Sequence, residues 1–235
     1  MVRNQTRGAR VTLTTTKPGD MHDETASQVN PTALGMHVKV LQAVRLKGRV
    51  SPADLATTLG EDHRVITEIV DQLTASGLLL EGTTVRISPA GRTRLNALLA
   101  EERTQVDPAA MAAAYNDFRS VNADFKVVVT DWQLKGGQTN THDDAGYDAA
   151  VLARLDAVHR RVQPIIAAAA AQLPRLGAYS AKLTAALDNV RSGDIAWLTK
   201  PLIDSYHTVW FELHEELILA VGLTREEAAR SGDAQ

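Results

Sequence analysis

The sequence contains no cysteine, so disulfides, thiolate metal ligands and cysteine nucleophiles are excluded. It also contains no apolar run of membrane-spanning length, and its N-terminus lacks the apolar core of a signal peptide. We therefore expect a cytoplasmic protein that makes no contact with a membrane. Aromatic residues are few, at 4 % of the chain, but 44 % of the residues are hydrophobic, which suffices for ordinary cores.

A chain of 235 residues is long enough for two small domains. The hydrophobic pattern changes twice, once near Pro31 and again near Asp107-Pro108. We predict a disordered N-terminal arm over residues 1–31, a first folded domain over residues 32–106, and an all-helical domain over residues 107–235, which we expect to bind a ligand and to form dimers.

The formal charge is unevenly distributed along the chain. The net charge is −3, but residues 1–100 carry +3 and residues 101–235 carry −6. Because attraction to phosphates requires local positive charge, this asymmetry favours DNA as a partner of the first half. The N-terminal arm contributes four basic residues, which either touch the DNA or belong to a solvated tail: Arg3, Arg7, Arg10 and Lys17.

The stretch from Thr32 to Arg103 predicts three helices, a short hairpin and a fourth helix. Ser51-Pro52 is a start signal for the second helix, which ends at Gly60, and Asp62 is placed to cap the third. Residues 78–81 and 84–87 flank a turn and indicate a two-stranded ribbon. The predicted fold is therefore mainly α, with an N-terminal winged helix-turn-helix that has a two-stranded wing, followed by an all-α helical bundle.

The segments Gly77-Leu78-Leu79 and Ile87-Ser88-Pro89-Ala90-Gly91-Arg92-Thr93-Arg94-Leu95 resemble the wing and the following helix of MarR-type regulators. The resemblance covers residues 32–103 and implies a homodimer that binds double-stranded DNA. The chain departs from the family pattern in its wing. Leu80 or Glu81 replaces the usual basic residue entering the wing, and the Asp-Arg pair of the wing tip is missing.

The residues expected to contact DNA lie on the third helix, in the wing and at the start of the following helix: Arg64, Thr67, Gln72, Arg86, Arg92 and Arg94. Glu68 and Asp71 share the exposed face of the third helix, and phosphates repel carboxylates. An acidic face of this kind supports the alternative that the winged helix docks a protein.

After Pro108 the pattern is helical throughout. We predict helices over about 108–134, 147–173, 178–191, 194–221 and 224–230, which would form an antiparallel bundle or an interleaved dimer. Polar and aromatic residues at helical spacing indicate a pocket for a small anionic or aromatic molecule, lined by Asn122, Trp132, Lys200, His207, Trp210 and His214. Alternatively, Asn122 is structural, the tryptophans are core residues and His214 is solvated.

The loop Gly136 to His142 is similar to the Gly-Gly-x-Thr-x-His loop of phosphoenolpyruvate-utilising enzymes, and the C-terminal half is similar to tails that accompany such enzymes. One extra residue precedes His142, and no Gly-rich nucleotide loop is present. We predict no catalytic residue, cofactor or metal site. Asp143 or Asp144 is interpreted as the cap of the following helix.

These patterns favour a DNA-binding transcriptional regulator that is not an enzyme and is controlled by a small-molecule effector in its helical domain. The alternative is an accessory or regulatory subunit of a phosphoenolpyruvate-utilising enzyme, with the winged helix as the docking module.

Overall fold

The computed structural model describes residue 1 and residues 31–230. The expected N-terminal arm, including Arg3, Arg7, Arg10 and Lys17, lies outside the described residues. Within residues 31–230 the protein is mainly α, with two small antiparallel sheets of two strands each. No helix in this range is both long and apolar enough to cross a membrane.

The N-terminal segment, residues 31–103, consists of four helices and one hairpin. In chain order the elements are α1 (Pro31–Lys47), α2 (Pro52–Leu59), α3 (His63–Ala75), β1 (Leu79–Leu80), β2 (Arg86–Ile87) and α4 (Pro89–Arg103). Strands β1 and β2 are antiparallel, with Leu79 opposite Ile87. Val50, between α1 and α2, forms a further antiparallel bridge to Val85, so the hairpin is anchored to the connection between these two helices.

Local caps determine where these helices begin. The Ser51 hydroxyl accepts a hydrogen bond from the Asp54 amide, and the Asp62 carboxylate accepts from the amides of Arg64 and Val65. Gly60 ends α2 with a left-handed backbone, φ 66°. The helix starts predicted at Ser51 and Asp62 are therefore confirmed.

The C-terminal segment, residues 106–230, contains the longer helices. Its elements are α5 (Pro108–Gln133), β3 (Leu134–Lys135), β4 (Gln138–Thr139), α6 (Ala145–Gln172), the 3₁₀ turn η1 (Pro174–Gly177), α7 (Ala178–Arg191), α8 (Ala196–Thr199), α9 (Tyr206–Ala220) and α10 (Arg225–Arg230). Between α5 and α6 the sequence predicted only a polar loop, but a small hairpin forms there. Gly136 and Gly137 both have positive φ, 60° and 80°, as a tight two-residue hairpin turn requires.

The prediction of one continuous helix over 194–221 is wrong. The chain leaves the helix at Lys200, whose backbone is extended (ψ 125°), and re-enters one at Tyr206. Pro201 explains the break, because its ring makes the helical conformation unfavourable for the residue before it, Lys200. Leu202 then takes a left-handed backbone, φ 68°. Lys200 consequently does not share a helix face with His207 and Trp210.

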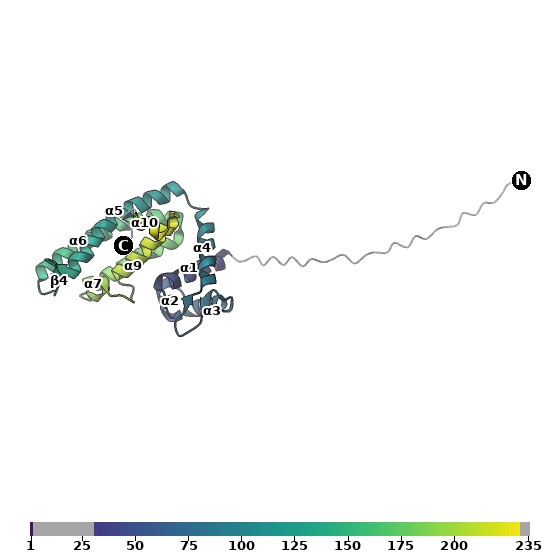
Figure 1. Ribbon diagram of the computed structural model, residues 1–235, viewed down its shortest axis with the longest axis horizontal. Coiled ribbons are helices and arrows are strands. Elements are labelled where there is room, and N and C mark those ends of the chain that lie inside the picture. The colour runs from purple at the N-terminus through teal and green to yellow at the C-terminus, as the bar shows by residue number, and fades with distance from the viewer. Residues whose placement is uncertain (2–30, 231–235) are drawn as a thin grey trace.

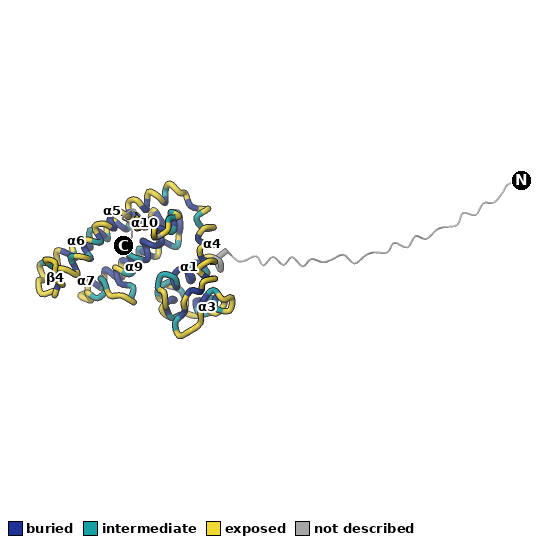
Figure 2. The backbone as a smooth tube through the Cα atoms, viewed as in Figure 1, coloured by how far each residue is buried: buried dark blue, intermediate teal, exposed yellow. Residues whose placement is uncertain are grey.

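The two segments have separate hydrophobic cores, one within residues 38–99 and one within residues 106–228. Figure 1 shows α1 to α4 gathered on one side and the long helices α5, α6 and α9 on the other. Helix α9 contacts both segments, packing against α5 and α7 of its own segment and against α4 of the first. It is buried on nearly every side (Figure 2), so the middle of the molecule is organised around it.

Candidate functional site

Helix α3 presents an exposed polar face. Arg64, Glu68, Asp71 and Gln72 are exposed, whereas Thr67 is half-buried and its hydroxyl donates to the His63 carbonyl oxygen at 2.8 Å. The face therefore offers one cation and two carboxylates to any partner. The acidic residues anticipated on this face are indeed solvent-facing.

The remaining basic residues expected to contact DNA are also exposed. Arg86 lies on β2, and Arg92 and Arg94 lie in the first turns of α4. Within residues 31–230, none of these three side chains, nor Arg64, takes part in an ion pair. Their charges are available to phosphates or to an acidic protein surface.

Four of the residues expected to line a pocket come together in the C-terminal segment. Asn122 on α5 and His207, Trp210 and His214 on α9 line a cavity of about 310 Å³. The indole N–H of Trp210 donates to the side-chain oxygen of Asn122 at 2.8 Å. Asn122 thus makes a structural hydrogen bond within the cavity wall.

Aromatic rings pack against the residues that line this cavity. The Phe125 ring stacks on Trp210 with centroids 4.3 Å apart, and the Phe118 ring lies 5.3 Å from the His214 ring. His214 is buried, so the alternative in which it is solvated is wrong. His207 is exposed at the cavity mouth, but partial desolvation of its imidazole beside the Phe125 ring lowers its pKa, which favours the neutral form. The cavity can hold a flat or apolar molecule against these rings, and the ammonium group of Lys126 on its wall adds a positive charge.

Trp132 and Lys200 do not line this cavity. Trp132 lies ten residues beyond Asn122 on α5, which corresponds to about 15 Å along a helix, and its ring packs 4.4 Å from that of His142. Lys200 is exposed in the connection between α8 and α9.

The His142 loop is held by local structural contacts. His142 Nδ1 lies 3.0 Å from Asp148 Oδ2, and Asp144 caps α6 by accepting from the Tyr147 amide at 3.0 Å. The cap prediction for Asp144 is confirmed. Within residues 31–230, no group of three histidine, aspartate or glutamate side chains is arranged to hold a metal ion.

Sequence reasoning missed a charged cluster at the junction of the two segments. Lys47 Nζ, at the end of α1, lies 2.7 Å from Glu212 Oε1 on α9 and also pairs with Asp204. The Arg175 guanidinium in η1 contacts Glu216 at 2.6 Å and makes a forked hydrogen bond with Glu102. Partners this distant in sequence leave no periodic signal, although carboxylates in an otherwise apolar helix do indicate buried charge.

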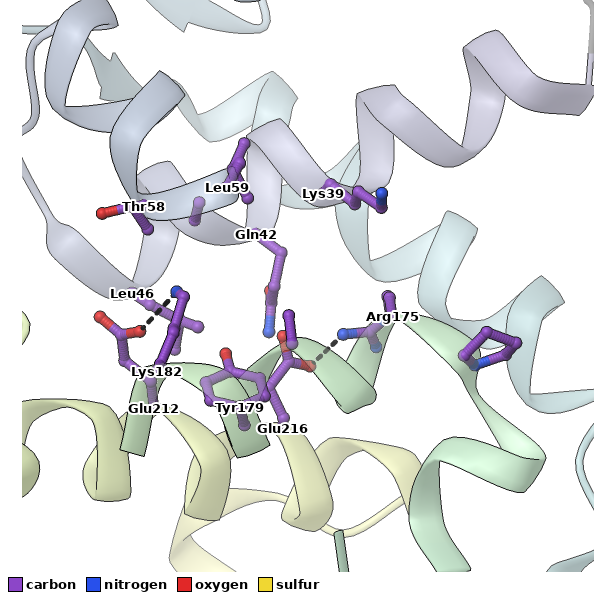
Figure 3. A pocket seen from close by; sticks show the side chains of 13 residues that line it. Lys39, Gln42, Leu46, Thr58, Leu59, Arg175, Tyr179, Lys182, Glu212 and Glu216 are labelled. Carbon is purple, nitrogen blue, oxygen red and sulfur yellow. Dashed lines mark ion pairs between the residues drawn. The ribbon is translucent and has the colours of Figure 1, made fainter. Parts of the chain in front are cut away.

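The junction also contains a cavity, of about 160 Å³ (Figure 3). Helices α1 and α2 form one wall, and η1, α7 and α9 form the other. Its lining includes both basic and acidic residues: Lys39, Arg175, Lys182, Glu212 and Glu216.

No protein-family model, curated protein or solved structure matches this chain.

Proposed function

We propose that the protein is a DNA-binding transcriptional regulator in which residues 32–106 act as a winged helix-turn-helix domain. The observation that carries this proposal is the geometry of α2, α3 and the β1–β2 hairpin. A tight turn at Gly60 joins α2 to α3, the hairpin follows α3 directly, and Val50 bridges to Val85 beside it. In this arrangement α3 would enter the major groove and the hairpin would serve as the wing.

Exposed cations support the proposal. Arg64 at the start of α3 would read a base edge, Arg86 would reach the minor groove, and Arg92 and Arg94 would hold phosphates. Thr67 and Gln72 complete the proposed contact set.

Regulation would come from the C-terminal segment. A small effector in the cavity lined by Asn122, His207, Trp210 and His214 would shift α9, which packs against both segments. In a homodimer the two winged helices must match half-sites about one DNA turn apart, so a small helix shift would change operator affinity.

Fluorescence anisotropy with the DNA upstream of the protein's own gene tests this function. We expect binding that exceeds binding to scrambled DNA and that weakens as the salt concentration rises. Arg64→Ala and Arg86→Ala should each weaken specific binding by about tenfold. Arg160→Ala, an exposed arginine on α6, is the matched control and should leave affinity unchanged. Equal affinity for scrambled DNA, or no effect of either variant, would refute the proposal.

A second candidate function rests on Glu68 and Asp71, which are both exposed on α3. Two carboxylates on the face that would enter a DNA groove favour a basic protein surface instead. In this alternative the protein is an accessory subunit of a phosphoenolpyruvate-utilising enzyme. Co-purification with such an enzyme, disrupted by Glu68→Lys and accompanied by no DNA retention at moderate salt, would support it.

A further inference from the structure

The cavity at the junction contains a buried amide that has no hydrogen-bond partner. Gln42 on α1 is 2 % exposed, and within the part of the chain that the structure describes neither its side-chain oxygen nor its nitrogen is hydrogen-bonded. Figure 3 shows this amide directed from α1 towards α7 and α9, into the space between the segments.

An unpaired buried amide is costly. Each unsatisfied donor or acceptor costs about 1–3 kcal/mol, so buried polar groups without partners are rare in native proteins. A leucine at this position would fill the same space without that cost. Retaining glutamine at such a position is explained if the amide forms its hydrogen bonds with a bound molecule.

The groups around Gln42 indicate what this molecule carries. Lys182 Nζ lies 3.7 Å from the Glu212 carboxylate, beyond hydrogen-bond distance, and 5.3 Å from the centre of the Tyr179 ring. Glu212 contacts Lys47 and Lys182, and a carboxylate has about four acceptor positions, so it retains capacity to accept further bonds. A cation and an anion therefore stand side by side at the cavity, each able to bind a further group.

The volume of the junction cavity and its lining residues further restrict the class of ligand that it can bind. At about 160 Å³ the cavity is smaller than the roughly 300–1,000 Å³ of pockets for drug-sized ligands. Its apolar lining comes from both segments and would cover a short side chain: Ala43, Leu46, Leu59, Pro174 and Ala178. The lining charges nearly balance, which disfavours a ligand of a single sign.

We propose that this cavity binds a compact zwitterion of the free α-amino acid class. The ammonium group would lie against Glu212 and Glu216, and the carboxylate would lie against Lys182. The Gln42 amide would donate to and accept from the ligand's polar groups. An α-amino acid fits because its ammonium and carboxylate groups are bonded to the same carbon, so that they lie side by side like the Lys182 and Glu212 groups.

Binding at this place has a structural consequence. The walls belong to α1 and α2 on one side and to η1, α7 and α9 on the other, so the ligand would hold the two segments together. Any ligand that binds only the folded, closed arrangement stabilises it by mass action. This site goes beyond the proposed function and does not depend on DNA binding.

Isothermal titration calorimetry of the full chain, without DNA, tests the site with the twenty free L-amino acids as probes. We expect saturable one-to-one binding of at least one of them, accompanied by a rise in the melting temperature. n-Butylamine and butyrate, which carry one charge each, should bind at least tenfold more weakly. Binding of either single-charge probe as tightly as the best amino acid would overturn the zwitterion assignment, as would no binding of any amino acid.

Variants separate a ligand site from a structural role. Gln42→Leu should weaken binding at least tenfold while its unliganded melting temperature is equal to or above that of the wild type. Lys182→Met should also weaken binding at least tenfold, whereas Lys126→Met, which alters the other cavity, should not. A lowered melting temperature of unliganded Gln42→Leu, or its unchanged affinity, would overturn the proposal. Because DNA is absent, failure here is distinct from failure of operator binding.

Discussion

The ammonium nitrogen of Lys47 lies 2.7 Å from Glu212 Oε1, and this contact joins the last turn of α1 to the middle of α9. Both side chains are largely buried, with 15 % and 4 % of their surfaces exposed. Burial opposes the charge on Lys47, but Glu212 and Asp204 outweigh it and raise the pKa of the Lys47 ammonium group above its ordinary value. The two segments are therefore joined by a buried ion pair whose Lys47 ammonium group keeps its charge.

Lys47→Met should lower the free energy of unfolding by about 3 kcal/mol, because Glu212 and Asp204 would lose their principal cation while remaining in the junction. Urea denaturation measures this change. Arg191→Met provides the matched control, since Arg191 also lies 2.7 Å from its partner, Asp156, but is exposed. The control should lose less than about 1 kcal/mol. Similar losses for the two variants would show that burial does not determine how much the Lys47 ion pair contributes to the free energy of unfolding.

We expect the free energy of unfolding to depend on pH through the His159 imidazole. Its Nδ1 lies 3.2 Å from the Tyr206 hydroxyl oxygen, and its Nε2 lies 3.1 Å from the Gln163 amide nitrogen. The Ser180 hydroxyl donates to the Gln163 oxygen, so the amide nitrogen faces the imidazole and Nε2 accepts. Burial, and then the positive charge of Arg191, lower the pKa of His159 below its ordinary value near 6.5.

A lowered pKa in the folded state means that the unfolded chain binds this proton more tightly. The destabilising effect is absent above pH 6.5 and grows as the pH falls through 6.5 towards the folded pKa. Urea unfolding at about pH 7.5 and about pH 5.5 should therefore show a smaller loss of stability for His159→Gln than for the wild type. In the wild type, an NMR titration should give a His159 midpoint below 6.5. A midpoint above that value would contradict the prediction.

The parts of the fold that were predictable are those specified by neighbouring residues. Ser51, Asp62 and Ser88 each cap the helix that begins after them, and a cap needs only a residue type and its next three amides. The break at Pro201 was missed because apolar residues recur at helical spacing on both sides of it. In that case the backbone restriction before proline outweighed the periodicity.

In the candidate site, too, only the residues that share one helix were predictable from the sequence. His207, Trp210 and His214 follow one another at helical spacing, so their shared face was visible in the sequence. The junction was not visible, because Lys47 and Glu212 belong to helices that meet only through the tertiary fold. Gln42 does not stand out from the rest of its helix in the sequence for the same reason. Its missing partners are a property of the packing around it and leave no mark in the local pattern.

Gly91 allows α4 to pack against the hairpin. A β-carbon on Gly91 would lie 2.0 Å from the Leu78 carbonyl oxygen, and backbone atoms cannot move aside cheaply. Gly91→Ala should therefore destabilise the protein by about 2 kcal/mol, measured by urea unfolding. Gly35→Ala on α1 is the matched control, because a β-carbon added there would meet nothing within 4 Å in the described part of the chain, and alanine favours helices. We expect the control to be neutral or stabilising, and equal destabilisation of both would contradict this explanation.

The Trp210 indole N–H donates a hydrogen bond to Asn122 at 2.8 Å, and its ring stacks on Phe125 inside the C-terminal segment. Trp210→Phe keeps a ring in the stack but removes the N–H, so the Asn122 oxygen loses this donor while it stays buried. We expect a loss of about 1–3 kcal/mol in the free energy of unfolding. Trp197→Phe, at a half-buried tryptophan packed against the same core, should cost less, because within residues 31–230 its indole does not donate to a buried side-chain acceptor. Equal losses for the two variants would show that the cost reflects lost ring volume and not the lost hydrogen bond to Asn122.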